Sequence, residues 1–220
     1  MKRWIKIERI PGVLASAYEK ATRMVIDSYY SQVADEIASY FTTGTILDLG
    51  TGPGYLPVEI VKRRPEAKII GVDLSKKLIR MARANAAKAG FSHQIKFEIG
   101  NSAGLHFDND AFDMVISTGM LHSLKDPVKV LKEIHRVLKE GGQAWIYDPA
   151  KVASDVDREN WKATLSVSEK FFLRIFELLG LHNPIETYHR EEVIPMIEAS
   201  GFQDYHIEER DREIRIKMEK

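Results

Sequence analysis

The stretch "ILDLGTGPGYLPVEI", residues 46–60, decides the fold. A short apolar run, Ile46 to Leu49, precedes three closely spaced glycines and a helix-like segment in which Pro57 stands near the start. Glycines between a strand and a helix let the backbone pass close to a ligand, and the first turn of a helix offers unpaired N–H groups. The stretch therefore predicts a strand, a ligand-binding loop and a helix, in that order.

Strands and helices alternate in the sequence that follows. A helix with an N-cap at Ser75 is expected to end at Gly90, and a second opens at Asp126-Pro127 and ends at Gly141-Gly142. Its apolar residues form one stripe: Val130, Ile134, Val137 and Leu138. The further strands are predicted at residues 69–72, 95–99, 112–117 and 144–147. This alternation indicates a parallel sheet with right-handed crossovers.

Both ends of the chain carry different patterns. Residues 12–41 read as one or two helices, with Val33, Ile37 and Tyr40 on one face. Near the other end, short strands at 203–208 and 213–217 are close enough to form an antiparallel hairpin. A helix is expected over residues 191–200, but Pro195 lies inside it, so the helix either starts late or is kinked.

The predicted fold class is α/β: a Rossmann-like, doubly wound, seven-stranded sheet, mostly parallel with an antiparallel C-terminal strand. We expect one domain over residues 1–220, divided into four parts. These are a helical cap (1–44), a cofactor-binding core (45–150), a variable substrate or lid segment (151–190), and a C-terminal helix and hairpin (191–220). The apolar run 171–181 predicts a lid or a homodimer surface, and the sequence leaves both open.

Composition narrows the function classes. The 220 residues contain 32 lysines and arginines and 32 aspartates and glutamates, a formal net charge of zero that weighs against a nucleic-acid partner. Cysteine is absent, which excludes disulfides, thiolate metal sites and a thiol nucleophile. No apolar run approaches the roughly 18 residues of a membrane span, and no signal-peptide core is present. A cytoplasmic protein is expected.

The spacing of the glycines bears on the ligand. Gly50, Gly52 and Gly54 read G-x-G-x-G, so the third glycine comes one residue before its place in the dinucleotide fingerprint G-x-G-x-x-G. Asp73 ends the second predicted strand, about 20 residues after the first glycine, where a carboxylate can accept hydrogen bonds from ribose hydroxyls. The pattern favours a nucleoside ligand and disfavours a nicotinamide-dependent reductase.

Four segments together resemble one known family. "LDLGTGPG", "IIGVDLS", "GNSAGLHFDNDAFDMVIS" and "VLKEIHRVLKEGGQAWI" are similar to the motifs of class I S-adenosylmethionine-dependent methyltransferases of the small-molecule type. The pattern is most similar to the group that includes the ubiquinone and menaquinone biosynthesis C-methyltransferases. The resemblance covers residues 46–149 closely and the C-terminal hairpin loosely. It implies S-adenosylmethionine as cofactor, S-adenosylhomocysteine as its product, and a small-molecule acceptor.

The resemblance also implies a role for particular residues. Asp48 would hold the donor's ammonium, Asp73 the ribose hydroxyls, and Leu74 would lie against the adenine. Asn101 stands where the family commonly has an aspartate that accepts from the adenine amino group, and the asparagine oxygen can still accept that bond. The other residues expected at the cofactor are Gly50, Thr51, Gly52 and Gly54 in the loop, Ser102 through its backbone N–H, and Thr118 near the methionine end.

Direct transfer from a sulfonium requires mainly alignment and exclusion of water, and no metal. A general base is needed only where the acceptor loses a proton, and His122, which follows the fourth strand, is the catalytic candidate; the alternative is a loop histidine that only packs. Tyr18 and Tyr29 would cover the cofactor or belong to the core. No role is expected for His93 and His106. The segment that contains His182, Tyr188 and His189 supplies part of the acceptor pocket in similar proteins, but these three residues are expected at the surface.

Other readings stay open beside this one. RNA or protein methylation is disfavoured by the zero net charge and because Tyr147-Asp148-Pro149 is not the Asn/Asp-Pro-Pro-aromatic motif of many amino-group methylating enzymes. A non-catalytic S-adenosylmethionine-binding module would keep Asp73 and the glycines. The acidic run Asp108, Asp110 and Asp113 lacks the glycine and terminal glutamate of a calcium loop, so a solvated turn is expected there.

Overall fold

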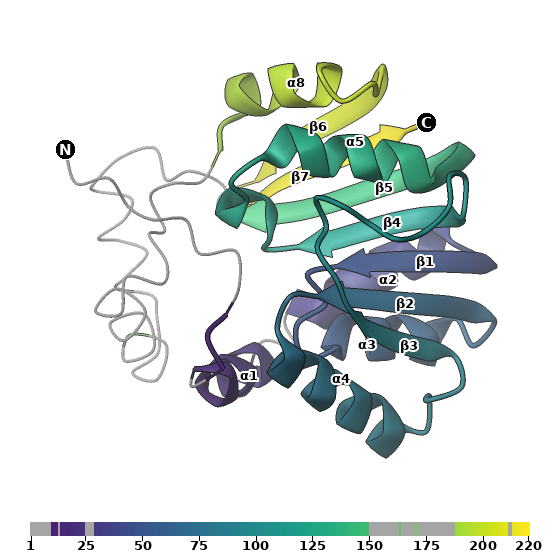
Figure 1. The fold of residues 1–220 in the computed structure, drawn as a ribbon, viewed down its shortest axis with the longest axis vertical. Helices are drawn as coiled ribbons and strands as arrows, with labels where there is room; N and C mark the ends of the chain where they lie inside the picture. Colours follow the sequence, from purple (N-terminus) through teal and green to yellow (C-terminus); the bar gives the residue numbers. More distant parts are fainter. Residues whose placement is uncertain are drawn as a thin grey trace.

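A seven-stranded sheet organises the computed structural model, which describes residues 10–12, 14–24, 29–149, 163, 170, 188–210 and 213–220 (Figure 1). The strands are β1 (Gly44–Leu49), β2 (Ala67–Asp73), β3 (Ile95–Ile99), β4 (Phe112–Thr118), β5 (Leu138–Pro149), β6 (Asp204–Arg210) and β7 (Glu213–Glu219). The helices are α1 (Ala15–Met24), α2 (Ser31–Tyr40), α3 (Tyr55–Arg63), α4 (Lys76–Ala89), α5 (Pro127–Val137) and α8 (Arg190–Glu198).

The order of the strands is β3-β2-β1-β4-β5-β7-β6. β1 to β5 pair in parallel, whereas β7 is antiparallel to both β5 and β6. The predicted fold class is therefore confirmed, and so is the hairpin. The chain moves outward from β1 to β3 and then returns to β4 on the other side of β1. In such sheets this reversal opens a ligand crevice at the carboxyl ends of the strands.

Alternate strand residues form two separate cores. Ile46, Met114 and Trp145 belong to the core on the face covered by α2, α3 and α4. Leu47 and Val115, one residue along from Ile46 and Met114, belong to the core under α5 and α8. Figure 1 shows α5 and α8 lying together across β4, β5, β6 and β7. Both faces are covered, which explains why the central strands are nearly continuous apolar runs.

Two predicted helices begin as the sequence indicated. Ser75 caps α4 by accepting from the Leu78 N–H, and Gly90 ends this helix in the left-handed conformation. Asp126 caps α5 by accepting from the Lys129 N–H, with Pro127 in the first turn. The Ser75 and Asp126 side chains thus accept hydrogen bonds from backbone N–H groups that have no partner within their helix.

The predicted end of α5 at Gly141-Gly142 is wrong. The helix ends at Val137, and β5 begins at once with the extended residue Leu138, so both glycines lie inside the strand. Gly141 has a φ of 72°, and its N–H donates to the Lys220 carbonyl. A Cβ on Gly142 would lie 2.8 Å from the Lys139 carbonyl oxygen. Both glycines allow the irregular backbone at the start of β5, where the register with β4 shifts.

Two other local expectations need correction. α8 does not start late: it begins at Arg190, where His189 and Glu192 form a capping box, and it continues through Pro195. Tyr40 does not share the buried face of Val33 and Ile37, because its side chain is 52% exposed. α2 ends at Tyr40, so the next residue, Phe41, turns into the core in its place.

The glycine loop is held by close packing behind it. Gly54 precedes α3 with a φ of 76°, and a Cβ there would lie 2.6 Å from Phe97 Cζ and 2.9 Å from Ala82 Cβ. A Cβ on Gly71, in the neighbouring strand, would lie 2.7 Å from the Phe97 ring. Distances this short leave no room for a methyl group, so the loop can reach this position only with glycine at both places.

We predict that Gly54→Ala destabilises the protein by about 2–4 kcal/mol, because the left-handed backbone and the overlap with Phe97 both add cost. Gly90→Ala is the matched control, since Gly90 has a φ of 85° but nothing within 4 Å of its Cβ position. It should lose only about 1–2 kcal/mol. Denaturant unfolding measures both values. Equal losses for the two variants would show that packing against Phe97 contributes nothing.

Candidate functional site

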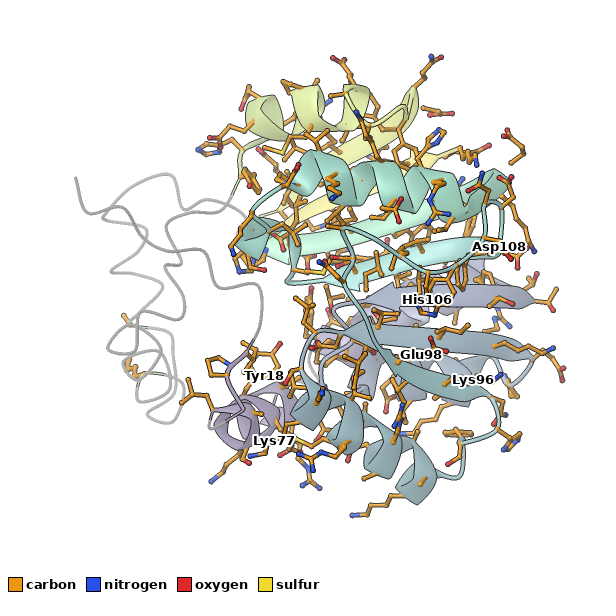
Figure 2. All side chains as sticks on the ribbon, in the orientation of Figure 1. Tyr18, Lys77, Lys96, Glu98, His106 and Asp108 are labelled. Atoms are coloured by element: carbon orange, nitrogen blue, oxygen red, sulfur yellow. The ribbon has the colours of Figure 1, made fainter. Side chains whose placement is uncertain are left out.

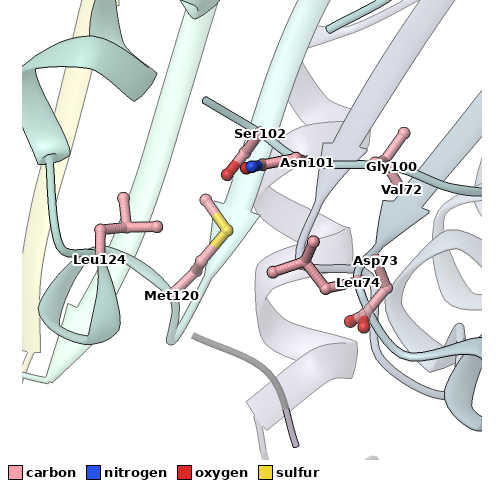
Figure 3. Close-up of a pocket in the computed structure, with 9 residues that line it drawn as sticks. Val72, Asp73, Leu74, Gly100, Asn101, Ser102, Met120 and Leu124 are labelled. Carbon is pink, nitrogen blue, oxygen red and sulfur yellow. The ribbon is translucent and has the colours of Figure 1, made fainter. Parts of the chain in front are cut away.

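Two cavities meet at Gly50, at the carboxyl ends of β1, β2 and β4. The first, drawn in Figure 3, is lined by Gly50, Val72, Asp73, Leu74, Gly100, Asn101, Ser102, Met120 and Leu124. The second is lined by Tyr18, Thr22, Tyr30, Asp48, Gly50, Thr51, Gly52, Pro53, Tyr55, Leu56 and Thr118. They lie where the strand order reverses, the expected place for a ligand in this fold.

The structure gathers nine of the ten residues predicted at the cofactor around these cavities. The first cavity collects Asp73, Leu74, Asn101 and Ser102, and the second collects Asp48, Thr51, Gly52 and Thr118, with Gly50 in both. Gly54 lines neither cavity and instead makes room for Phe97. The wall residues Met120 and Leu124 carried no signal in the sequence, since apolar side chains after a strand are common.

Backbone hydrogen bonds fix the glycine loop. The N–H groups of Gly50 and Thr51 both donate to the Val72 carbonyl, at 2.9 and 3.1 Å. Gly50 and Gly52 have positive φ angles of 72° and 54°. A Cβ on Gly50 would lie 3.0 Å from the Met120 sulfur, so the cavity wall on that side requires glycine. The loop thus turns sharply with its backbone beside both cavities.

Asp73 holds the loop and closes β2. Its Oδ2 accepts from the Gly52 N–H at 3.1 Å, and its Oδ1 accepts from the Ser75 N–H at 2.7 Å. In Figure 3 Asp73 and Leu74 stand across the cavity from Met120 and Leu124. A ligand there meets a fixed carboxylate on one side and an apolar wall on the other.

Asn101 and Ser102 lie at the end of the first cavity. The Asn101 Oδ1 accepts from the Ala103 N–H at 2.9 Å, and a turn follows in which the Gly104 N–H donates to the Asn101 carbonyl. This bond leaves one lone pair on Oδ1 for a further donor. Ser102 is buried behind the turn. The turn therefore presents the Asn101 amide oxygen at the cavity.

Asp48 is a carboxyl buried in the second cavity, with 2% of the residue exposed. Burial raises its pKa from the usual 3.8 to about 7, and the negative charge of Asp73 adds to this rise. None of the groups that shift this pKa is a cation. A carboxyl in such a place is stabilised by a proton or by a positively charged ligand.

Two tyrosines from the N-terminal region enclose the same cavity. Tyr18, on α1 (Figure 2), lies over the loop: its Cε1 is 3.6 Å from the position that a Cβ on Gly52 would take. Burial, then Asp73, raise its pKa to about 12. Tyr30 is hydrogen-bonded to Thr118, and burial raises its pKa too. Both phenols thus stay neutral beside Asp48 in the second cavity.

Tyr29, expected either to cover the cofactor or to belong to the core, lines neither cavity and packs against the core beneath α2, α3 and α4. It is hydrogen-bonded to Glu213 at the start of β7, and burial raises its pKa. Tyr30, its neighbour, is the residue that reaches the second cavity, and sequence reasoning missed it. The two adjacent tyrosines point to different partners, which periodicity alone could not distinguish.

His122 lies in a short 3-10 helix, Leu121–Ser123, between the two cavity residues Met120 and Leu124, but it lines neither cavity itself. Its backbone N–H donates to Asp148 Oδ2 at 2.9 Å, and its ring Nδ1 is 3.1 Å from both carboxylate oxygens. The His122 side chain is 12% exposed and that of Asp148 is fully buried. The histidine predicted from sequence therefore has a buried carboxylate partner at the end of β5.

Other polar residues have structural roles. Asp113 lies in β4, not in a solvated turn: it accepts from the Thr45 N–H and pairs with Lys139 at 2.7 Å, so the prediction for the acidic run is wrong there. Asp108 and Asp110 are exposed as expected. His106 pairs with Glu98 at 2.9 Å on the outside of the sheet (Figure 2). His182 and residues 171–181 lie outside the described residues.

No group of three or more His, Cys, Asp or Glu side chains among the described residues could hold a metal ion. In the same part of the chain, no helix combines the length and apolar character that crossing a membrane requires.

Comparison with known proteins identifies the family. A family model described as "Methyltransferase domain" matches residues 42–205, so the chain belongs to that family. Ubiquinone/menaquinone biosynthesis C-methyltransferase UbiE of Geotalea daltonii is 28% identical over 147 residues, which are 65% of this chain and 63% of that protein. The recognition of a class I S-adenosylmethionine-dependent methyltransferase from the motifs is therefore confirmed. The chain matches only about 63% of the length of this relative.

Solved structures share the fold. A protein of Methanococcus maripaludis, described as an S-adenosylmethionine-dependent methyltransferase, is 21% identical with a TM-score of 0.74, covering all of this chain and 97% of that one. The [4+2]-cyclase SpnF is 20% identical with a TM-score of 0.62, covering 80% of this chain and 60% of that one. One fold thus accompanies two chemistries, so function must be argued from the site.

We predict that Asp48→Asn changes how stability depends on pH. The folded protein keeps the Asp48 proton up to about pH 7, whereas the unfolded chain loses it near 3.8, so this group lowers stability as pH rises between those values. From pH 5 to pH 8 the wild type should lose about 2–3 kcal/mol relative to Asp48→Asn. Denaturant unfolding without ligand at both pH values measures this. A constant difference would mean that Asp48 is already ionised at pH 5.

Proposed function

We propose that the chain transfers the methyl group of S-adenosylmethionine to a small-molecule acceptor by direct displacement. The observation that carries the proposal is the gathering of nine sequence-predicted residues around two cavities that meet at Gly50. Family membership supports the reaction type. The UbiE relatives support a small acceptor, although the identity is low and the match covers part of their length.

The residues present fit S-adenosylmethionine. Asp48 is a carboxyl buried in the second cavity, no cation of the described residues is among the groups that shift its pKa, and the donor's ammonium would compensate its charge. Asp73 offers a fixed carboxylate to the ribose hydroxyls, and Leu74 and Met120 offer apolar faces to the adenine. Asn101 and the backbone N–H groups of its turn would bind the edge of the ring. Gly54 is assigned packing rather than contact.

Bound S-adenosylmethionine supplies a methyl group on a sulfonium, which is already a good leaving group. The chain's own contribution is then to orient the two reactants and to exclude water. Tyr18 and Tyr30 close the second cavity and keep the region around Asp48 dry. Where the acceptor must lose a proton, His122 takes it as general base.

Two alternatives remain with weaker support. Methylation of RNA or protein is opposed by the zero net charge, which gives no general attraction to a nucleic acid. A module that binds S-adenosylmethionine without catalysis is opposed by the buried His122–Asp148 pair, which such a module would not need. The homodimer and the cytoplasmic location remain predictions from the sequence.

We predict that Asp73→Asn weakens the binding of S-adenosylhomocysteine by about 10- to 100-fold, because hydrogen bonds to a charged acceptor contribute about 1.5–3 kcal/mol. Isothermal calorimetry measures the affinity. Asp108→Asn makes the same chemical change at an exposed position and should bind as the wild type does. Unchanged affinity in Asp73→Asn would remove the ribose assignment. Binding of NADH in place of S-adenosylhomocysteine would remove the proposed ligand.

We predict that the protein transfers labelled methyl groups from S-adenosylmethionine into the small-molecule fraction of a cell extract. The extract is divided by size and by protease and nuclease digestion after the reaction. Asp73→Asn, at a subsaturating donor concentration, should lower the label in proportion to its weaker binding. Label found only in protein or RNA would favour the macromolecular alternative, and no label in any fraction would favour the non-catalytic module.

A further inference from the structure

Glu133 and Arg136, here called the α5 pair, bind the backbone of the connection between β3 and β4. Arg136 donates from Nε to Glu133 Oε1 at 2.8 Å and from Nη2 to Glu133 Oε2 at 2.9 Å, which makes the pair bidentate. Glu133 Oε2 also accepts from the Leu105 N–H at 2.7 Å, and Arg136 Nη2 donates to the Leu105 carbonyl at 3.1 Å. Both backbone polar groups of Leu105 are therefore bound by side chains of one helix.

The α5 pair also binds the residues that follow Leu105. Arg136 Nη1 donates to the Phe107 carbonyl at 2.8 Å and to Asn109 Oδ1 at 3.0 Å. Hydrogen bonds from Arg136, and one from the Leu105 N–H, lower the pKa of Glu133, so this carboxylate is charged at neutral pH. Residues 100–111 form no helix or strand, so the α5 pair supplies partners that a regular element would otherwise provide.

Leu105 directly follows the turn that lines the first cavity. The turn is closed by the Gly104 N–H, which donates to the Asn101 carbonyl at 3.1 Å. At its other end, the Gly100 N–H donates to the Asp73 carbonyl at 3.2 Å. The turn is therefore held by β2 on one side and by the α5 pair on the other. Neither residue of the pair lines a cavity, so an effect of the pair on a ligand must pass through the turn.

The turn fixes which end of the Asn101 amide accepts hydrogen bonds. Asn101 and Ser102 lie together at one end of the cavity (Figure 3). The Ala103 N–H donates to Asn101 Oδ1 at 2.9 Å, which determines the orientation of the amide. A reversed amide would place Nδ2 against the Ala103 N–H, so that two donors would face each other and one hydrogen bond would be lost. The oxygen held in this way suits a ligand group that donates.

We propose that Glu133 and Arg136 are positioning residues that make the first cavity select a base with an amino group over a base with a carbonyl at the same position. This inference rests on the proposed function, in which Asn101 binds the adenine edge. While the α5 pair holds Leu105, the Ala103 N–H keeps its place and Asn101 Oδ1 accepts from the 6-amino group. Without the pair the turn loosens, the amide reverses at lower cost, and Nδ2 donates to a carbonyl instead.

The first test compares the binding of two ligands by calorimetry: S-adenosylhomocysteine and its deaminated form, S-inosylhomocysteine, which has a carbonyl in place of the 6-amino group and a hydrogen on N1. The wild type should prefer the amino form about 10- to 100-fold, and Arg136→Met should lower this preference about 3- to 10-fold. A general loss of stability would weaken the binding of both ligands alike and leave their ratio unchanged. Equal binding of both forms by the wild type, or an unchanged ratio in Arg136→Met, would overturn the proposal.

Arg63→Met is the matched control. Arg63, on α3, donates to Glu59 Oε2 at 2.7 Å and to the Glu59 carbonyl at 2.8 Å, and it lines neither cavity. The substitution removes an arginine from the same kind of ion pair on a helix surface, so the ratio of the two affinities should stay at the wild-type value. A fall as large as that in Arg136→Met would show that the loss of any such pair alters the ratio, and the assignment to the α5 pair would be wrong.

The double variant Asn101→Ala/Arg136→Met tests whether the α5 pair acts through Asn101. Asn101→Ala should itself lower the preference for the amino form, and the addition of Arg136→Met should lower it no further. Two effects that multiply would mean that Arg136 acts by another route, which contradicts the proposal.

Two further outcomes keep the test decisive. Should Arg136→Met not fold, Arg136→Lys replaces it: one ammonium cannot hold Glu133 and the carbonyls of Leu105 and Phe107 together, so the preference should fall at least about twofold, and an unchanged ratio refutes the inference. Wild-type protein that binds neither ligand refutes the proposed function. Normal binding of S-adenosylhomocysteine with the same ratio in wild type and variants refutes this inference alone.

Discussion

The hydrogen bond from the Gly52 N–H to the Asp73 carboxylate is the contact on which the site depends. It joins the loop after β1 to the end of β2, and the bonds from Gly50 and Thr51 to the Val72 carbonyl close the same junction. This arrangement brings the loop backbone and the carboxylate to one cavity edge. The same carboxylate therefore both holds the loop and lines the first cavity.

Most of the fold followed from the sequence because its signals are local and repeated. Ser75, Gly90 and Asp126 act on helix ends within a few residues, so their effects could be predicted without tertiary context. Gly141 and Gly142 led to a wrong prediction for the end of α5, because a left-handed glycine occurs both at helix ends and at irregular strand starts. Only the pairing of β5 with its neighbours distinguishes the two.

The sequence predicted those residues of the candidate site that lie at the ends of strands. Asp48, Asp73 and Thr118 were placed at one sheet edge because parallel strands end together. Tyr30 and Asp148 were missed for different reasons. Tyr30 reaches the cavity from outside the sheet, by a path that no periodicity encodes. Asp148 was considered only as part of Tyr147-Asp148-Pro149, which does not match the motif of amino-group methylating enzymes. Its partner His122 lies 26 positions away in the sequence, so no local pattern links the two residues.

The alternation of the strands separates two buried carboxyl groups with different tasks. Asp48 follows the direction of Ile46, toward α2 and α3, and Asp148 follows that of Ile146, toward α5. Asp48, with the raised pKa, suits a ligand that brings its own positive charge. Asp148 already accepts a hydrogen bond from the His122 backbone N–H before any ligand arrives.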